Sequence, residues 1–145
     1  MNAILTLLVL CITGLSSIAQ KTDSLKLLCP LNNAVEPPAE KKSFDMGAEQ
    51  PKLFLTSATD TTVKACISGT VTNIMRDEEG KYEVMFHNKD HYFWYSGLTK
   101  ATVRKGQKLQ AGEAIGLLTP GHKMELMLYD FETPVDPKKF LNCGK

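Results

Sequence analysis

The stretch VRKGQKLQAGEAIG, residues 103–116, carries three glycines at short intervals between apolar residues. Glycine adopts a positive φ without strain, so this spacing predicts short strands that turn sharply, as in a small barrel or sandwich. Upstream, residues 69–75 are typical of a strand, Asp77–Gly80 has the composition of a hairpin turn, and apolar side chains alternate again over residues 82–86. These patterns predict an all-β fold, a small two-layer antiparallel sandwich or barrel.

An aromatic run follows a second predicted turn at residues 88–90. Alternation along a strand places Tyr92 and Trp94 on one face and Phe93 and Tyr95 on the other. One pair is therefore expected in the core, and the other is a candidate lining for a groove. Residues 124–129 alternate in the same way and predict a last long strand.

Composition limits the chain to one domain with a net charge close to zero. Of its 145 residues, 43% are hydrophobic, which is enough for one core and too little for two. Seventeen Lys and Arg oppose sixteen Asp and Glu without a large block of one sign. We therefore expect no nucleic-acid partner.

The N-terminus predicts export. An apolar run at residues 4–15 is followed by small residues, which fits a signal peptide over residues 1–19, cleaved after Ala19. The segment before the run lacks Lys and Arg, so an uncleaved anchor is the alternative, and no other membrane span is expected. Residues 20–51 contain several prolines and predict an extended arm or linker, and residues 52–143 form the β domain. The expected location is outside the cell or in the periplasm and cell envelope.

Three cysteines remain after such cleavage: Cys29, Cys66 and Cys143. An oxidising compartment favours one disulfide and one buried thiol. Cys29 and Cys143 lie near the two ends of the mature chain, and a bridge between them would tie the termini together. Three pairings are possible, and the sequence only weakly favours Cys29–Cys143.

Four motifs in order resemble the lysostaphin-like (LytM-type) peptidases of family M23, whose β-sheet domain is the duplicated hybrid motif. They are residues 63–71, residues 83–87 with 95–98, the glycine stretch 103–116, and the closing PVDPKKFL at 134–141. The glycine stretch alone is shared in part with biotinyl and lipoyl carriers. Together the four imply the M23 fold.

The resemblance implies a zinc site that this chain does not reproduce. Active members hold zinc with an early His, an Asp a few residues on, and a late His-x-His pair, and a further His assists the attacking water. The matching positions here are Gln50, Phe54, Lys123 and Glu125, and the assisting position is Gly97. A catalytic zinc needs about three protein ligands and an open position for water. We therefore expect no zinc cofactor and no catalytic residue.

A rebuilt metal site is the alternative. His87, Asp90 and His91 flank one predicted turn and would have to converge on an ion. That arrangement would make the chain a working zinc endopeptidase with a rearranged site. The simpler interpretation is that both histidines make ordinary hydrogen bonds on a hairpin.

The resemblance implies a non-catalytic exported domain that binds through its former cleft. By analogy with degenerate members of the family, the expected partner is peptidoglycan or a cell-wall hydrolase. The candidate binding positions are the five family site positions together with one aromatic residue: Gln50, Phe54, Gly97, Lys123, Glu125 and Trp94. A structural or adhesive domain with no ligand is a third possibility.

Overall fold

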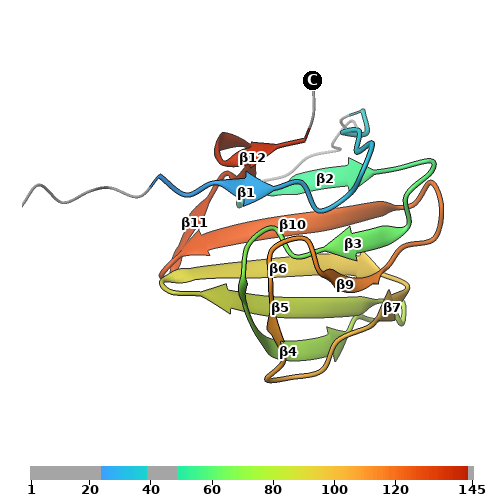
Figure 1. The fold of residues 1–145 in the computed structure, drawn as a ribbon. Coiled ribbons are helices and arrows are strands. Elements are labelled where there is room, and N and C mark those ends of the chain that lie inside the picture. Colours follow the sequence, from blue (N-terminus) through green and yellow to red (C-terminus); the bar gives the residue numbers. More distant parts are fainter. Residues whose placement is uncertain (1–23, 39–48, 144–145) are drawn as a thin grey trace, which may run out of the picture.

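The computed structural model describes residues 24–38 and 49–143, and the regular secondary structure of this part of the chain is almost wholly β-strand (Figure 1). A single turn of 3-10 helix, η1 (Pro137–Lys139), precedes the last strand. The strands are β1 (Leu27–Leu28), β2 (Leu53–Thr56), β3 (Thr62–Lys64), β4 (Gly69–Arg76), β5 (Tyr82–Asn88), β6 (His91–Leu98), β7 (Lys100–Ala101), β8 (Lys108–Leu109), β9 (Ala114–Leu117), β10 (Lys123–Asp130), β11 (Thr133–Val135) and β12 (Leu141–Asn142).

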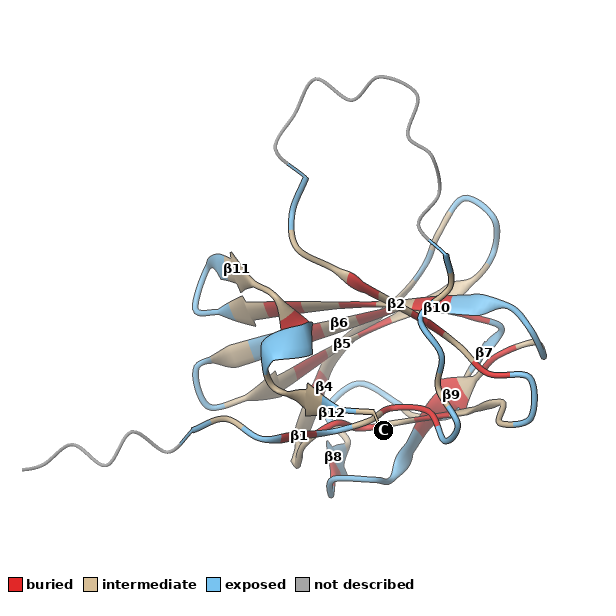
Figure 2. Cartoon of the chain, turned by 90° about the horizontal axis from the view of Figure 1, so that it is seen from above, coloured by how far each residue is buried: buried red, intermediate tan, exposed pale blue. Residues whose placement is uncertain are grey.

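The strands form one large antiparallel sheet and two small sheets. The large sheet has the order β11-β10-β6-β5-β4-β8, and β2 also pairs with β10. β3, β9 and β7 form a second antiparallel sheet, and β1 pairs with β12 in parallel. Figure 2 views the large sheet nearly edge on, with β9, β1 and β12 on one side of it. The predicted all-β, two-layer antiparallel fold is confirmed.

The core lies between these layers, and the alternation of each strand decides which residues enter it. Phe93 and Tyr95 are buried on β6, whereas Tyr92 is 41% exposed on the opposite face. The same alternation buries Leu126 and Leu128 on β10. One face of the large sheet is therefore buried in the core, and the opposite face is not covered by another layer.

Cys66 belongs to this buried core. Its backbone N–H donates to the Tyr95 hydroxyl at 3.0 Å, and both residues are buried. Burial raises the pKa of the Cys66 thiol to about 12, partly offset by its hydrogen bond with Tyr95. Cys66 is therefore a protonated, packed thiol at neutral pH and not a nucleophile.

The N-terminal arm is part of the packed domain over residues 24–38. Leu27 and Leu31 are buried in the core, at 4% and 2% exposure, and the Leu28 N–H donates to the Cys66 carbonyl at 2.8 Å. A disulfide joins Cys29 to Cys143. The predicted domain begins at residue 52, but two of the leucines that fill the core, Leu27 and Leu31, come from before it.

The predicted signal peptide, residues 1–19, lies outside the described residues. Within the described ranges, no helix is long and apolar enough to cross a membrane.

Candidate functional site

A cleft of about 480 Å³ opens on the exposed face of the large sheet. Its walls come from β2, β5, β6, β10 and the turn between β4 and β5. Five of the six binding positions expected from the sequence line it together: Phe54, Trp94, Gly97, Lys123 and Glu125. Residues up to 71 positions apart in sequence thus lie on one surface.

Strand register brings these side chains together. Glu125 on β10 lies opposite Phe54 on β2 and opposite Ser96 on β6. Residues directly opposite each other in antiparallel strands project to the same face. Because β10 is paired on both sides at this point, the cleft floor is rigid sheet and not loop.

Gln50 is placed elsewhere. It is exposed, and its side-chain Oε1 accepts a hydrogen bond from the Tyr129 hydroxyl at 2.9 Å. It does not line the cleft. Gln50 instead fixes an aromatic side chain further along β10.

Two lysines lie around Phe54. Lys123 lines the cleft, and Lys52 lies beside it. The Lys52 and Lys123 ammonium groups lie 5.3 Å and 5.1 Å from the centre of the Phe54 ring. Lys52 Nζ also lies 3.5 Å from Glu125 Oε2. Cations within about 6 Å of a ring face are attracted by its quadrupole, so this ring holds two positive charges near it. Lys52 was not predicted, because the family motifs do not include that position.

This set of residues does not fit zinc. A phenyl ring has no lone pair for a metal, an ammonium group repels a divalent ion, and the nearby carboxylate of Glu125 is paired with Lys52. Within residues 24–38 and 49–143, no three His, Cys, Asp or Glu side chains are grouped so that they could hold a metal ion. We derive no metal-dependent step at this cleft.

Gly97 holds a backbone conformation that excludes other residues. Its φ is +83°, and a Cβ added there would lie 2.9 Å from the Lys123 carbonyl oxygen. Real Cβ atoms essentially never approach a backbone atom so closely. A histidine at this position, where the family places its assisting histidine, would require both a strained φ and a shift of β10.

The family model of peptidase family M23 matches residues 52–137. The chain belongs to this family. The match covers the cleft, the glycine stretch and most of the large sheet. No curated protein matches the chain.

Solved structures with this M23 fold include peptidases and a pore-forming complex. Lysostaphin from Staphylococcus simulans is 23% identical with a TM-score of 0.53, covering 69% of this chain and 48% of that one. A mutant catalytic domain of the prophage-encoded M23 protein EnpA from Enterococcus faecalis is 16% identical with a TM-score of 0.56, covering 75% and 90%. The SpoIIQ-SpoIIIAH complex matches at 17% identity with a TM-score of 0.60, covering 83% and 93%. This M23 chain therefore spans about half of the lysostaphin chain.

The three residues considered for a rebuilt metal site do not converge in this M23 domain. The His87 ring packs against Tyr92, with ring centres 4.7 Å apart. His91 Nε2 lies 3.9 Å from the Asp130 carboxylate, and the Asp90 carbonyl accepts from the Phe131 N–H. The two histidine rings therefore contact different neighbours, and among the described residues these side chains form no group that could hold a metal ion.

The turn between β4 and β5 adds negative charge to the cleft wall. Asp77, Glu78 and Glu79 all line the cleft. Lys81 holds the turn: its Nζ lies 2.8 Å from Glu79, and its backbone N–H donates to Asp77 at 2.8 Å. The sequence predicted only a hairpin turn here, because its position over the cleft depends on the length and twist of the β4–β5 hairpin. The cleft thus has Lys123 on its floor, Lys52 beside it, and carboxylates on its wall.

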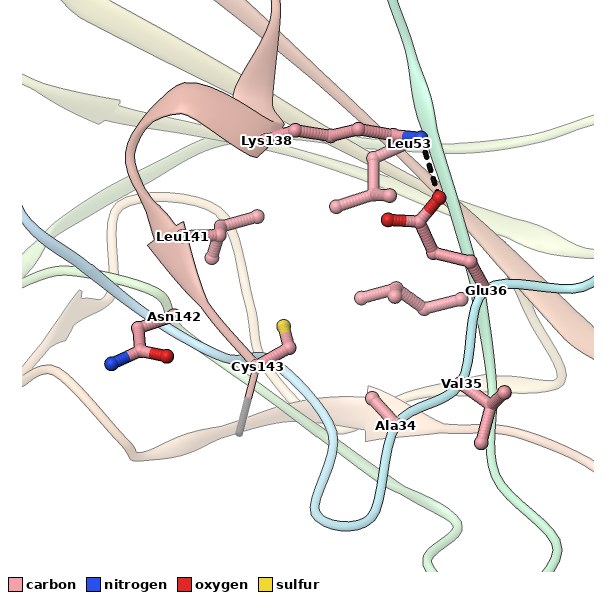
Figure 3. Close-up of a pocket in the computed structure, with 9 residues that line it drawn as sticks. Ala34, Val35, Glu36, Leu53, Lys138, Leu141, Asn142 and Cys143 are labelled. Atoms are coloured by element: carbon pink, nitrogen blue, oxygen red, sulfur yellow. Dashed lines mark hydrogen bonds and ion pairs between the residues drawn. The ribbon is translucent and has the colours of Figure 1, made fainter. Parts of the chain in front are cut away.

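A second cavity, of about 500 Å³, lies where the arm docks against the C-terminal segment (Figure 3). Figure 3 shows Leu53 and Leu141 on its walls, with an ion pair between Lys138 and Glu36 joining the two sides. Its lining is mainly aliphatic. This cavity lies along the contact between the arm and the C-terminal segment, and we assign it no binding role.

Proposed function

We propose that this chain is a non-catalytic M23 domain of the cell envelope that binds the peptide stems of peptidoglycan through its cleft. The observation that carries the proposal is the cleft itself. The sheet that forms an M23 cleft is complete, yet the positions expected to bind zinc hold Phe54 and Lys123.

The charge arrangement supports a zwitterionic ligand. A peptide stem carries carboxylates and amines. Lys123, which is exposed and positioned over Phe54, can donate to a carboxylate, and the acidic turn Asp77–Glu79 can accept from an amine. Charge-assisted hydrogen bonds of this kind are stronger than neutral ones. No step of bond cleavage is assigned to the site.

A cell-wall hydrolase held by the same cleft is the alternative occupant. The SpoIIQ-SpoIIIAH complex, which shares the fold, is an assembly of two different proteins. A protein partner would need additional buried area around the cleft, whereas a peptide stem fits within it. Retention on purified sacculi without any added protein distinguishes the two occupants.

Removing the Lys123 charge is expected to weaken retention on purified sacculi about tenfold, because a hydrogen bond to a charged group contributes roughly 1.5–3 kcal/mol. The measurement is the bound fraction of Lys123→Ala against the native protein over a range of sacculus concentrations. The difference should shrink at high salt, since exposed charges are screened.

Lys108→Ala is the matched control. Lys108 is an exposed lysine on β8 that does not line the cleft, so its removal changes the net charge equally. Equal retention of the native protein and both variants would remove the cleft from the account. Retention of none of them, with capture only after a cell-wall hydrolase is added, would favour the protein partner.

A further inference from the structure

An aromatic pocket lies beside the cleft on the same open face of the large sheet. Its volume is about 290 Å³, and the side chains that define it are Met85, Tyr92, Trp94, Tyr129 and Phe131. Trp94 lines both this pocket and the charged cleft. The two hollows are therefore neighbours along β6 and β10, and a linear ligand could occupy both.

Cross-strand pairing brings the side chains of the aromatic pocket together. Tyr92 on β6 lies opposite Tyr129 on β10, and Trp94 lies opposite both Met127 on β10 and Met85 on β5. Tyr129 lies six positions after Lys123 on β10, so the open face runs for roughly 20 Å from the charged end to the aromatic end.

The aromatic side chains are held in place before any ligand binds. The Trp94 indole N–H donates to Glu83 at 3.2 Å, and the Tyr129 hydroxyl donates to Gln50 at 2.9 Å. The Tyr92 ring is packed against His87. Fixed side chains lose little rotamer freedom on binding, which favours a rigid ligand with flat apolar faces.

Phe131 supplies the decisive observation. It occupies the two-residue turn between β10 and β11 with φ of 52°, a position where glycine or asparagine is the usual residue. Its side chain is nevertheless large and apolar, and it is 63% exposed at the pocket. The Phe131 N–H donates to the Asp90 carbonyl at 2.7 Å, which ties this turn to the β5–β6 turn. Both the positive φ and the exposure are unfavourable for folding, and a ligand contact at the pocket would give this phenylalanine a role.

The surroundings favour a sugar over an apolar protein segment. Asp130 and Glu132 flank Phe131 in sequence, and both are exposed. An apolar helix or strand laid over the pocket would remove the Glu132 carboxylate from water, together with the Asp130 carboxylate that lies 3.9 Å from His91 Nε2, and burying charged groups is costly. A sugar ring presents C–H groups to the aromatic faces and hydroxyl groups at its edge, and those hydroxyls can donate to the carboxylates.

We propose that the aromatic pocket binds a sugar ring of a glycan strand while the cleft holds the attached peptide stem. The inference rests on the proposed function, because it names the second component of the same polymer. It adds a glycan subsite formed by Tyr92, Trp94 and Phe131 at the end of the sheet remote from the former zinc positions.

Trp94 is the only tryptophan of the chain, so its fluorescence reports on the pocket directly. We expect a saturable change in its emission when the full protein is titrated with a peptide-free oligomer of N-acetylglucosamine. Tyr92→Thr and Phe131→Asn should each shift the titration midpoint to about tenfold higher concentration, as expected for loss of one buried aromatic contact. Phe131→Asn should melt at the same temperature as the native protein or higher, since asparagine tolerates positive φ, so its loss of binding cannot come from unfolding.

Two controls separate this inference from the cleft proposal. Val35→Thr removes an apolar residue that is 61% exposed and lies outside the pocket, and it should titrate like the native protein. Lys123→Ala should bind the oligosaccharide normally but bind a free stem peptide weakly. Absence of a saturable sugar response, or unchanged midpoints in Tyr92→Thr and Phe131→Asn, would overturn the glycan subsite. A normal sugar response without any response to stem peptide would leave the glycan subsite standing and remove the cleft proposal.

Discussion

Replacing Gly97 with alanine is expected to lower the free energy of unfolding by roughly 2–5 kcal/mol. A non-glycine residue in the left-handed region costs about 1–2 kcal/mol, and forcing an extra methyl group into a packed site costs about 1–3 kcal/mol more. Both terms apply because φ is +83° and the new Cβ would meet the Lys123 carbonyl oxygen at 2.9 Å. Urea unfolding of the two proteins measures the difference, and Gly97→His should be destabilised at least as much.

Gly80→Ala separates the cost of the positive φ from the cost of the steric contact. Gly80 has a similar φ of 79°, but nothing lies within 4 Å of its added Cβ. Its replacement should therefore cost only the strain term, about 1–2 kcal/mol. Equal losses in both variants would show that the backbone of β10 yields easily, and a histidine could then be accommodated beside the cleft.

Removing the disulfide is expected to destabilise the protein by about 3–5 kcal/mol, because the bridge closes a very long loop in the unfolded chain. Cys29 and Cys143 are separated by 114 positions. The bridge also holds Leu27 and Leu31 of the arm against the core. Urea unfolding of the double variant Cys29→Ser, Cys143→Ser measures the loss, and limited proteolysis should cut the arm of that variant first.

The reductant control uses the same two proteins. Dithiothreitol should lower the unfolding midpoint of the native protein and leave that of the double variant unchanged. Cys66 is buried and does not take part in the bridge, so it contributes equally to both proteins. A native protein that unfolds at the same urea concentration with and without reductant would contradict the stabilising role of the bridge.

Local patterns predicted the sheet well. Both hairpin turns and the alternation over β6 and β10 follow from periodicity, which reports on neighbouring residues and on single strand pairs. The cleft positions Phe54, Lys123 and Glu125 came instead from the resemblance to the M23 motifs. The Cys29–Cys143 bridge is present, although the sequence left three pairings open.

Features that depend on tertiary packing were not predicted. The docking of Leu27 and Leu31 is absent from the local pattern, since a proline-rich arm contains no strand period. Lys52 and Gln50 both precede β2, and their partners on β10 are set by tertiary packing: Lys52 pairs with Glu125 beside the cleft, whereas Gln50 accepts a hydrogen bond from Tyr129 away from it. Phe131 was missed because its importance lies in backbone conformation and exposure, which a sequence pattern does not express.

The floor of the cleft is formed by backbone pairing. Paired strands lie on both sides of β10, and this pairing does not depend on a metal ion. The two lysines around Phe54 place positive charge at the cleft, and an anionic group of a ligand can pair with it.

The metal content of the full protein, purified in the presence of excess zinc and then dialysed, tests the central claim most directly. The account predicts no stoichiometric zinc, whereas the same sample is retained on sacculi. One tightly held zinc per chain, lost when Glu125, His87 or His91 is replaced, would contradict it and establish a rearranged M23 metal site.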